Sequence, residues 1–168
     1  YLTLYAFSSE NWKRPPSEVD DLMALLRHYL RREIKELHGN NVRVQFIGDH
    51  VPLADDIKSL ITSAESETAA NTGLTLTIAI NYGSHNEILS ACKKVAKAVQ
   101  DGSLQPNSIT EEVFERFLDT SNTPSPDLLI RTSGEQRLSN FLLWQLAYSE
   151  LIFMDTLWPD FTKQHLEE

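Results

Sequence analysis

The sequence predicts an α/β protein with a mostly parallel central sheet, helices on both faces of that sheet, and an active site at the carboxyl edge of its strands. Short apolar runs, many of them β-branched, alternate along the chain with longer segments that have helical spacing, and this order is typical of parallel sheets. Polar residues follow each of the first four short runs directly. Ligands bind at the carboxyl ends of strands in open α/β sheets, so these loops form the candidate site.

Five short segments have the composition of strands. The first, residues 1–8, is apolar on both pleat faces, which predicts a strand buried inside a parallel sheet. The others are residues 42–47, 74–80, 126–130 and 150–153. Because parallel strands release their loops on the same side, one edge of the sheet is expected to carry the loops after Phe7, Ile47, Ile80 and Ile130.

The segments between the strands have helical spacing. Residues 17–37 carry a broad apolar face, with Ser17 at the N-cap position and Gly39 as the stop. Most of this face is predicted to pack in the core, and the alternative is that part of it lines an apolar ligand channel. Ser84 and Glu87 have the spacing of a capping box, which favours a structural role for Glu87 over a catalytic one. Further helices are predicted over residues 54–71, from Thr110 onward, and after Ser139.

Composition excludes several classes of protein. The formal net charge of −9 argues against a general nucleic-acid binder, which needs a basic face for the phosphate backbone. Cys92 is the only cysteine, so an internal disulfide and a zinc site of several cysteines are excluded. The sequence has no apolar run of membrane-spanning length and no segment that resembles a signal peptide. A single domain over residues 1–168, located in the cytoplasm, is the simplest expectation.

The stretch from Pro126 to Phe153 carries the strongest chemical signal. A buried strand leads into a loop with two arginines, which can grip phosphate oxygens bidentately. Free N–H groups at the predicted helix start near Ser139 and Asn140 would add donors for the same anion. A carboxylate near a phosphate repels it unless a hard cation lies between them, so Glu150 indicates magnesium. The alternative is a solvated loop with surface salt bridges.

The loop after the first strand, SSENWKRPP, mixes hydroxyls, an acid, an amide, an indole, a base and two prolines. It places Ser8, Ser9, Glu10 and Asn11 at the carboxyl end of a strand, where ligands bind in this class of fold. The alternative is an ordinary β-to-α connection in which Trp12 is a packing residue.

Three motifs, SSENWKRP, IAINYGSHNEI and PDLLIRTSGEQRLSNFLLWQLAYSELIF, occur in this order and together resemble the cis-prenyltransferase family. The resemblance covers nearly the whole chain. It implies a homodimeric, Mg²⁺-dependent enzyme that condenses isopentenyl diphosphate repeatedly onto an allylic diphosphate such as farnesyl diphosphate. By the same resemblance, the new double bonds would be cis, and the product would be a long-chain polyprenyl diphosphate, a carrier-lipid precursor. Such a product implies peripheral contact of the enzyme with a membrane for its release.

The resemblance also implies roles for residues of the first loop. Asn11 would assist proton removal or orient the condensing substrate, with Ser8 and Glu10 supporting it. Trp12 and Arg14 would shape a mobile loop beside the allylic substrate.

In the loop that follows the strand at residues 126–130, the resemblance implies that Arg131, Arg137 and Ser139 bind the diphosphate of isopentenyl diphosphate. Glu135 would order the arginine loop, and Glu150 would help to hold Mg²⁺ there.

The chain departs from the family pattern in two respects. The N-terminal segment of the family, with its DGNGRWA-like motif for magnesium and the allylic diphosphate, is not in this sequence, so part of the active site is expected to lie outside it. Ser84, His85 and Asn86 stand where the family often has a glycine and an arginine, and Gln136 stands where a histidine is common. Gln136 cannot carry a proton, so an acid–base role at that position is not expected.

Two other functions are compatible with parts of the pattern. One is a non-catalytic subunit that supports a catalytic partner, although such a subunit has no chemical need for both the SSENW and the RTSGEQR loops. The other is a generic phosphate-binding or phosphatase-like α/β domain, which would hydrolyse diphosphates without forming carbon–carbon bonds.

Overall fold

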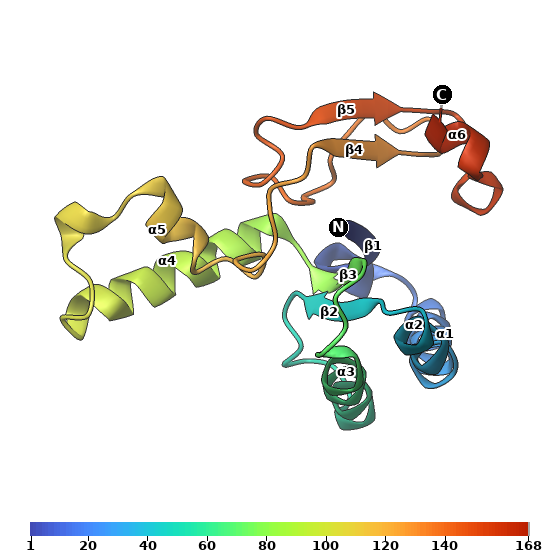
Figure 1. Cartoon of the computed structure of the whole chain (residues 1–168), viewed down its shortest axis with the longest axis horizontal. Coiled ribbons are helices and arrows are strands. Elements are labelled where there is room, and N and C mark those ends of the chain that lie inside the picture. Colours follow the sequence, from blue (N-terminus) through green and yellow to red (C-terminus); the bar gives the residue numbers. More distant parts are fainter. Residues whose placement is uncertain (168) are drawn as a thin grey trace. The chain divides into compact units, whose positions relative to one another are not determined.

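In the computed structural model (Figure 1), which describes residues 1–167, the chain divides into two compact units, Tyr1–Thr123 and Pro124–Glu168. Each unit is described by itself below. The three earlier predicted strands lie in the first unit, and the two later ones lie in the second. All strand pairs are parallel, so the predicted α/β class with a mostly parallel sheet is confirmed.

The first unit contains a three-stranded sheet in the order β1-β3-β2, formed by β1 (Leu2–Ser8), β2 (Arg43–Ile47) and β3 (Thr75–Tyr82). The central strand β3 is the most buried of the three. Burial of the first strand on both faces was expected, and this expectation is wrong, because Phe7 is the only residue of β1 that is buried. The strand lies at the edge of this sheet and has β3 as its one neighbouring strand.

Helices α1 (Pro16–Arg32), α2 (Ile34–Gly39) and α3 (Asp55–Thr68) pack with this sheet around one hydrophobic core (Figure 1). Figure 1 also shows α4 (Ser84–Gln100) extending away from the sheet. The largest fully buried core side chains in the first unit include Ile57 and Val44. The helical elements of the unit are η1 (Ser9–Lys13), α1 (Pro16–Arg32), α2 (Ile34–Gly39), α3 (Asp55–Thr68), α4 (Ser84–Gln100), η2 (Pro106–Ser108) and α5 (Glu111–Glu115).

The helix predicted over residues 17–37 is divided in two. It begins one residue earlier than expected, at Pro16, where a missing N–H costs nothing. Glu33 has helical dihedral angles but separates α1 from α2, and Gly39 is the last residue of α2. Three residues of α1, Val19, Met23 and Leu30, are buried in the core, which confirms the packing role predicted for most of this face.

The capping box predicted at Ser84 and Glu87 is wrong. The residue that precedes α4 is Gly83, and Ser84 is already the first helical residue. Both Ser84 and Glu87 are buried. The carboxylate of Glu87 instead accepts hydrogen bonds from Tyr82 and from the backbone of Asp119, so its structural role lies in tertiary packing.

The second unit contains two parallel strands, β4 (Leu128–Arg131) and β5 (Glu150–Phe153), and ends in η3 (Trp158–Asp160) and α6 (Lys163–Glu167). The helix predicted after Ser139 is wrong, because residues 139–148 form turns and bends. Ser139, Asn140 and Leu142 have φ angles of 50°, 61° and 46°, which a right-handed helix cannot accommodate. None of the helices over residues 1–167 is both long and apolar enough to cross a membrane.

Candidate active site at the carboxyl ends of the strands

The carboxyl end of β1 turns directly into η1 through a reciprocal cap. The backbone N–H of Ser8 donates to Oδ1 of Asn11 at 2.8 Å, and the Ser8 side chain accepts from the Asn11 backbone. This capping box holds the amide of Asn11 in one orientation. Oδ1 accepts this bond, and the amide nitrogen is the donor group of the side chain. Whether Asn11 orients the condensing substrate or assists proton removal stays a prediction.

Trp12 joins this loop to the loop that follows β3. Its indole N–H donates to Oδ1 of Asn81 at 2.7 Å, and its ring meets Phe7 edge-on with 5.2 Å between the ring centroids. The side chain is nevertheless 39% exposed. Trp12 is therefore a packing residue, as the alternative reading of this loop predicted. Part of its side chain is still exposed at this edge of the sheet.

Asn81, at the carboxyl end of β3, forms hydrogen bonds with the loops that follow β1 and β2. Besides accepting from Trp12, it donates from Nδ2 to the carbonyl oxygen of Asp49 at 2.6 Å, and its own carbonyl accepts the Asp49 N–H at 3.2 Å. Its φ angle is 49°, a left-handed conformation that asparagine tolerates better than most residues. The sequence analysis placed the residues after Ile80 in the candidate site but gave Asn81 no role of its own.

Gly48 allows the loop after β2 to approach β3 closely. Its φ angle is 115°, and a Cβ atom at this position would lie 2.2 Å from the carbonyl oxygen of Ile80. No side chain fits there without movement of the backbone. The N–H of Gly48 donates to Oδ2 of Asp119 at 3.2 Å, so the loop is held from both sides.

A buried polar network lies behind the Asn81 backbone. The hydroxyl of Tyr82 donates to Oε2 of Glu87 at 2.5 Å, while Oε1 of Glu87 accepts the N–H of Asp119 at 2.9 Å. Burial raises the pKa of the Tyr82 hydroxyl well above its ordinary value, and the negative charge of Glu87 raises it further. Tyr82 is therefore a fixed donor and not an acid or base at neutral pH.

Glu10 and Arg14 occupy the exposed side of the first loop. Glu10 accepts a hydrogen bond from the Ser9 hydroxyl at 3.2 Å. Arg14 lies 3.4 Å from Glu18, one turn into α1, and both side chains are about half exposed. Such a surface pair is weak, so Arg14 can leave Glu18 for a ligand at little cost.

In the second unit, Arg131 is the last residue of β4 and pairs with Phe153 of β5. The pairing continues beyond both strands, because Met154 N–H donates to the Arg131 carbonyl and Gly134 N–H donates to the Met154 carbonyl, both at 2.9 Å. Gly134 has a φ angle of 69°. The start of the arginine loop is therefore held against the residues that follow β5.

Arg137 and Glu135 form an ion pair within the arginine loop, with 2.5 Å between Nη1 and Oε2. The Arg137 side chain is 65% exposed, which leaves its guanidinium accessible to a ligand. The expected role of Glu135 in ordering the loop stays a prediction. Ser139 lies in a turn with left-handed backbone and not at a helix start, so the N-terminal helix donors expected near it do not exist.

Glu150 lies at the opposite end of the two-stranded sheet from Arg131. The register pairs Glu150 with Leu128 and Arg131 with Phe153, which separates the two positions by three residues, or roughly 10 Å of strand. Over residues 1–167, no three His, Cys, Asp or Glu residues are grouped so that they could hold a metal ion. Glu150 is exposed and belongs to no such group, and its carboxylate could offer one or both of its oxygens to a metal ion.

The predicted site residues thus form two sets. In the first unit, the structure brings Ser8, Asn11 and Trp12 to the loops after β2 and β3. In the second unit, it brings Arg131 and Arg137 to one loop at the carboxyl end of β4. The assembly of both sets into one site stays a prediction.

Comparison with known proteins identifies the family. Residues 1–168 match the model of the undecaprenyl diphosphate synthase family. The chain is 58% identical over 164 residues to an isoprenyl transferase of Agrobacterium fabrum and 56% identical over 167 residues to one of Geobacillus kaustophilus. These matches cover 98% and 99% of this chain and 66% and 65% of the relatives. The chain therefore spans slightly less than two thirds of their length.

Solved structures agree with this result. The fold is similar to that of lavandulyl diphosphate synthase from Lavandula x intermedia, crystallised with dimethylallyl diphosphate, with a TM-score of 0.95 and 42% identity over 99% of this chain and 72% of that one. It is also similar to a probable undecaprenyl diphosphate synthase from Campylobacter jejuni, with a TM-score of 0.88 and 38% identity over 99% and 76% of the two chains. The chain belongs to the undecaprenyl diphosphate synthase family of prenyltransferases.

Proposed function

We propose that the protein is a cis-prenyltransferase that adds isopentenyl diphosphate repeatedly to an allylic diphosphate, with farnesyl diphosphate as the expected primer. The product is a long-chain polyprenyl diphosphate. The observation that carries this proposal is the family match over residues 1–168, combined with a chain that retains both chemically specific loops. The Lavandula structure contains an allylic diphosphate, which supports this substrate class.

Each round of the reaction forms one carbon–carbon bond and breaks one carbon–oxygen bond. The terminal alkene carbon of isopentenyl diphosphate bonds to the first carbon of the allylic chain, whose diphosphate leaves with the bonding electron pair. A proton then leaves the isopentenyl unit. Negative charge therefore grows on the departing diphosphate, and positive charge grows on the allylic carbon. The site needs fixed hydrogen-bond donors around the diphosphate and an apolar wall that keeps water away from the allylic carbon.

The arginine loop is proposed to bind the diphosphate of isopentenyl diphosphate. Arg131 is the last residue of β4, and Arg137 is paired with Glu135 in the loop that follows. Guanidinium groups bind phosphate oxygens bidentately. Ser139 would add a hydroxyl donor. The exposed ion pair between Arg137 and Glu135 contributes little stability, so Arg137 can exchange this partner for phosphate.

The first loop is proposed to orient the isopentenyl unit beside the allylic chain. Asn11 presents its amide N–H₂ from the cap with Ser8, while Trp12 is positioned by Asn81. Glu10 and Arg14 lie on the exposed side of this loop, where they would contact the substrate that enters. An amide donor and an indole face suit a diphosphate and a prenyl chain, respectively.

Magnesium is the proposed cofactor. The donor set fits this ion only in part, because Glu150 belongs to no group of three His, Cys, Asp or Glu residues within residues 1–167. Mg²⁺ commonly uses one or two carboxylates together with substrate phosphates and water, and a single glutamate meets that need. When bound, the ion would neutralise charge on the diphosphate. Homodimer formation and peripheral contact with a membrane are further expectations of the family resemblance.

The proposal is tested by incorporation of labelled isopentenyl diphosphate into extractable product, primed with farnesyl diphosphate. Because the matched relatives are longer, the assay uses the 168-residue chain both alone and joined to the N-terminal segment of a relative. Arg131→Ala and Arg137→Ala are each expected to lower incorporation by about a hundredfold or more, since each removes a charged donor to the diphosphate. Arg116→Ala, an exposed arginine outside both loops, is the matched control.

Normal turnover in Arg131→Ala or Arg137→Ala would contradict the proposed role of the loop. Release of inorganic phosphate without a longer product would indicate a phosphatase-like domain. No product from either form of a folded wild-type chain would favour the non-catalytic subunit.

A further inference from the structure

Asp119 follows the short helix α5 and contacts both the loop after β2 and the first turn of α4. Its Oδ2 atom accepts the backbone N–H of Gly48 at 3.2 Å, and its own backbone N–H donates to Oε1 of Glu87 at 2.9 Å. These bonds join residues that lie 71 and 32 positions apart in the sequence. Nothing in the proposed reaction uses Asp119.

The segment that carries Asp119 is anchored on α4. Leu118 is 3% exposed, and Nζ of Lys94 donates to the carbonyl oxygen of Phe117 at 3.2 Å. The same Nζ lies 3.8 Å from Oδ1 of Asp119, so the lysine balances the charge of the carboxylate and leaves Oδ2 to Gly48. A carboxylate that accepts an N–H in this way forms a charge-assisted hydrogen bond.

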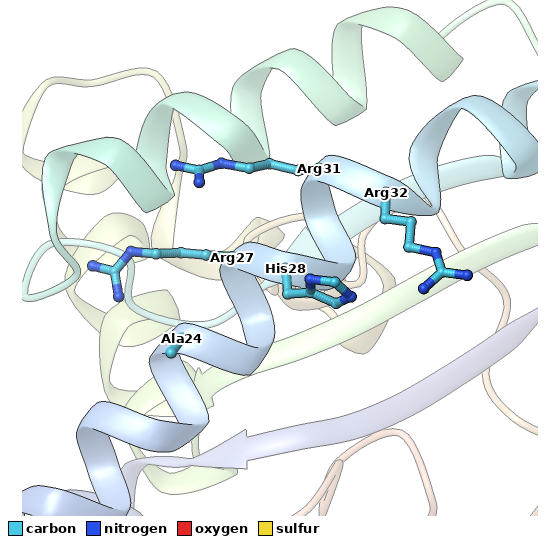
Figure 2. A pocket seen from close by; sticks show the side chains of 5 residues that line it. All are labelled: Ala24, Arg27, His28, Arg31 and Arg32. Carbon is cyan, nitrogen blue, oxygen red and sulfur yellow. The ribbon is translucent and has the colours of Figure 1, made fainter.

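The first unit also contains a carboxylate–cation pair of a different kind. Arg27, which Figure 2 shows extending from the same side of α1 as Arg31, donates two hydrogen bonds of 2.6 and 3.1 Å to Asp56 of α3. That pair joins two helices through their side chains. The carboxylate of Asp119 instead accepts a backbone N–H, so a change at Asp119 acts directly on the backbone of a loop in the predicted site.

The loop after β2 is bonded in turn to the residue that positions Trp12. Asp49 follows Gly48 and donates its N–H to the Asn81 carbonyl at 3.2 Å, while its own carbonyl accepts from Nδ2 of Asn81 at 2.6 Å. Oδ1 of Asn81 accepts the indole N–H of Trp12 at 2.7 Å. A series of hydrogen bonds and one peptide link therefore connects Asp119 with Trp12.

Gly48 is the residue of this series that most needs an external constraint. Glycine loses more conformational freedom on folding than any other residue, and Gly48 has a φ angle of 115° close against the Ile80 carbonyl. The bond from Asp119 restricts Gly48 from one side. The bonds between Asp49 and Asn81 restrict the loop from the other.

From these contacts we infer that Asp119 is a positioning residue for the loop that carries Asn11 and Trp12. Its carboxylate holds the backbone at Gly48, and Asn81 transmits this constraint to the indole. Asp119 acts through these neighbours and not on the reacting atoms. The inference rests on the proposed function, in which the indole face of Trp12 meets the prenyl chain of the allylic substrate.

The first test follows the indole N–H of Trp12 by ¹H–¹⁵N NMR of the 168-residue chain without substrate. The chain has three tryptophans, and the spectrum of Trp12→Phe identifies the resonance. Asp119→Ala is expected to shift this resonance, because Gly48 loses its acceptor. Asp119→Asn keeps an oxygen acceptor and is expected to leave the resonance near its wild-type position.

Glu65→Ala is the matched control. Oε1 of Glu65 accepts the backbone N–H of Phe46 in β2 at 3.0 Å, so this variant also removes a carboxylate from a backbone N–H, two residues before Gly48. It is expected to leave the Trp12 resonance in place. An equal shift in the control, an unchanged resonance in Asp119→Ala, or a shift in Asp119→Asn as large as that in Asp119→Ala would overturn the proposal.

A double variant tests the route through Asn81. In the Asn81→Ala background, Asp119→Ala is expected to cause no further shift of the Trp12 resonance, because the link between the two residues is already broken. A further shift as large as that in the wild-type background would contradict this route.

A kinetic test uses the chain joined to the N-terminal segment of a relative. Asp119→Ala is expected to raise the KM for the allylic diphosphate about fivefold, the effect of one lost hydrogen bond. The KM for isopentenyl diphosphate should stay unchanged, because the arginine loop belongs to the other unit. An equal rise in both KM values, or a fall in kcat alone, would contradict the positioning role.

The two tests separate this inference from the proposed function. Absence of prenyl transfer by the folded wild-type chain would contradict the proposed function. The NMR result would still decide whether Asp119 holds the Trp12 loop, because it needs no substrate. Prenyl transfer by the wild-type chain, with an unchanged Trp12 resonance in Asp119→Ala, would contradict only the role of Asp119.

Discussion

Asn81 has a left-handed backbone, with φ of 49°, and three hydrogen bonds to Trp12 and Asp49 hold it there. An asparagine side chain is short and can both accept and donate, so one residue links the loops after all three strands of the first sheet. Trp12 is thereby positioned by a residue that would not need to touch substrate. Changes at Asn81 are expected to act on the site through its neighbour.

Asn81→Ala is predicted to lower the free energy of unfolding by about 1–3 kcal/mol, because the indole N–H of Trp12 and the Asp49 carbonyl lose their partner. It should also shift the Trp12 emission, measured as the difference between spectra with and without Trp12→Phe. Asn86→Ala, at an exposed position on α4, is the control. An unchanged stability and spectrum would show that Asn81 does not hold the loop.

Tyr82→Phe is predicted to destabilise the protein by about 1–3 kcal/mol at neutral pH, because buried Glu87 loses its hydroxyl donor. The pKa of Tyr82 is higher in the folded than in the unfolded chain. Its contribution is therefore complete below the ordinary tyrosine pKa of about 10 and is lost as the pH rises above it. Urea unfolding from pH 7 to 11 checks this, with Tyr29→Phe as the exposed control. A stability difference that grows above pH 10 would contradict the assignment.

Individual site residues could be predicted where they directly follow a strand in the sequence. A structural role for Glu87 was predicted from its spacing with Ser84, but the predicted interaction, a capping box with Ser84, was wrong. A capping box is a local pattern, whereas the bonds from Tyr82 and Asp119 depend on how a distant segment folds back. The hydrogen bonds of Asn81 could not be predicted for the same reason, since they reach loops 32 and 69 residues away.

At the level of elements, the loop after β2 depends on a residue without a side chain. Gly48 lies against the Ile80 carbonyl in a conformation that favours glycine. The same loop supplies Asp49, which Asn81 binds. Displacing this loop would therefore disturb the edge of the sheet that carries Trp12.

Gly48→Ala is predicted to cost at least about 2 kcal/mol of stability, because the new methyl group would meet a backbone oxygen that cannot move without the strand. Gly102→Ala is the matched control, since Gly102 has a φ of 74° but open space around it. It should cost only about 1–2 kcal/mol, the strain of the backbone alone. Chemical unfolding of both variants measures the difference. Equal losses would show that the close contact with Ile80 is unimportant.

Strands could be predicted more reliably than helices here. All five apolar runs form strands, because β-branched composition and length are local properties. The helix after Ser139 was predicted from apolar content alone, and left-handed residues at positions 139, 140 and 142 break it. The division at Glu33 leaves no signal either, since neither glycine nor proline marks it.

At the scale of the whole molecule, the predicted site draws on two compact units. Ser8, Asn11 and Trp12 belong to the first unit, and Arg131 and Arg137 belong to the second. Each loop could be predicted separately, because each follows a recognisable strand. That both loops serve one site is an expectation of the family resemblance and stays a prediction. The match over residues 1–168 confirms the family itself.

The most direct test of prenyl transfer is mass spectrometry of the lipid extract after incubation with isopentenyl and farnesyl diphosphates. The chain is joined to the N-terminal segment of a relative, and parallel reactions contain Mg²⁺ or a chelator. The proposed function predicts a series of products that grow by one isoprene unit, and only when Mg²⁺ is present. Farnesyl diphosphate that stays unextended by a folded protein in the presence of Mg²⁺ would contradict it.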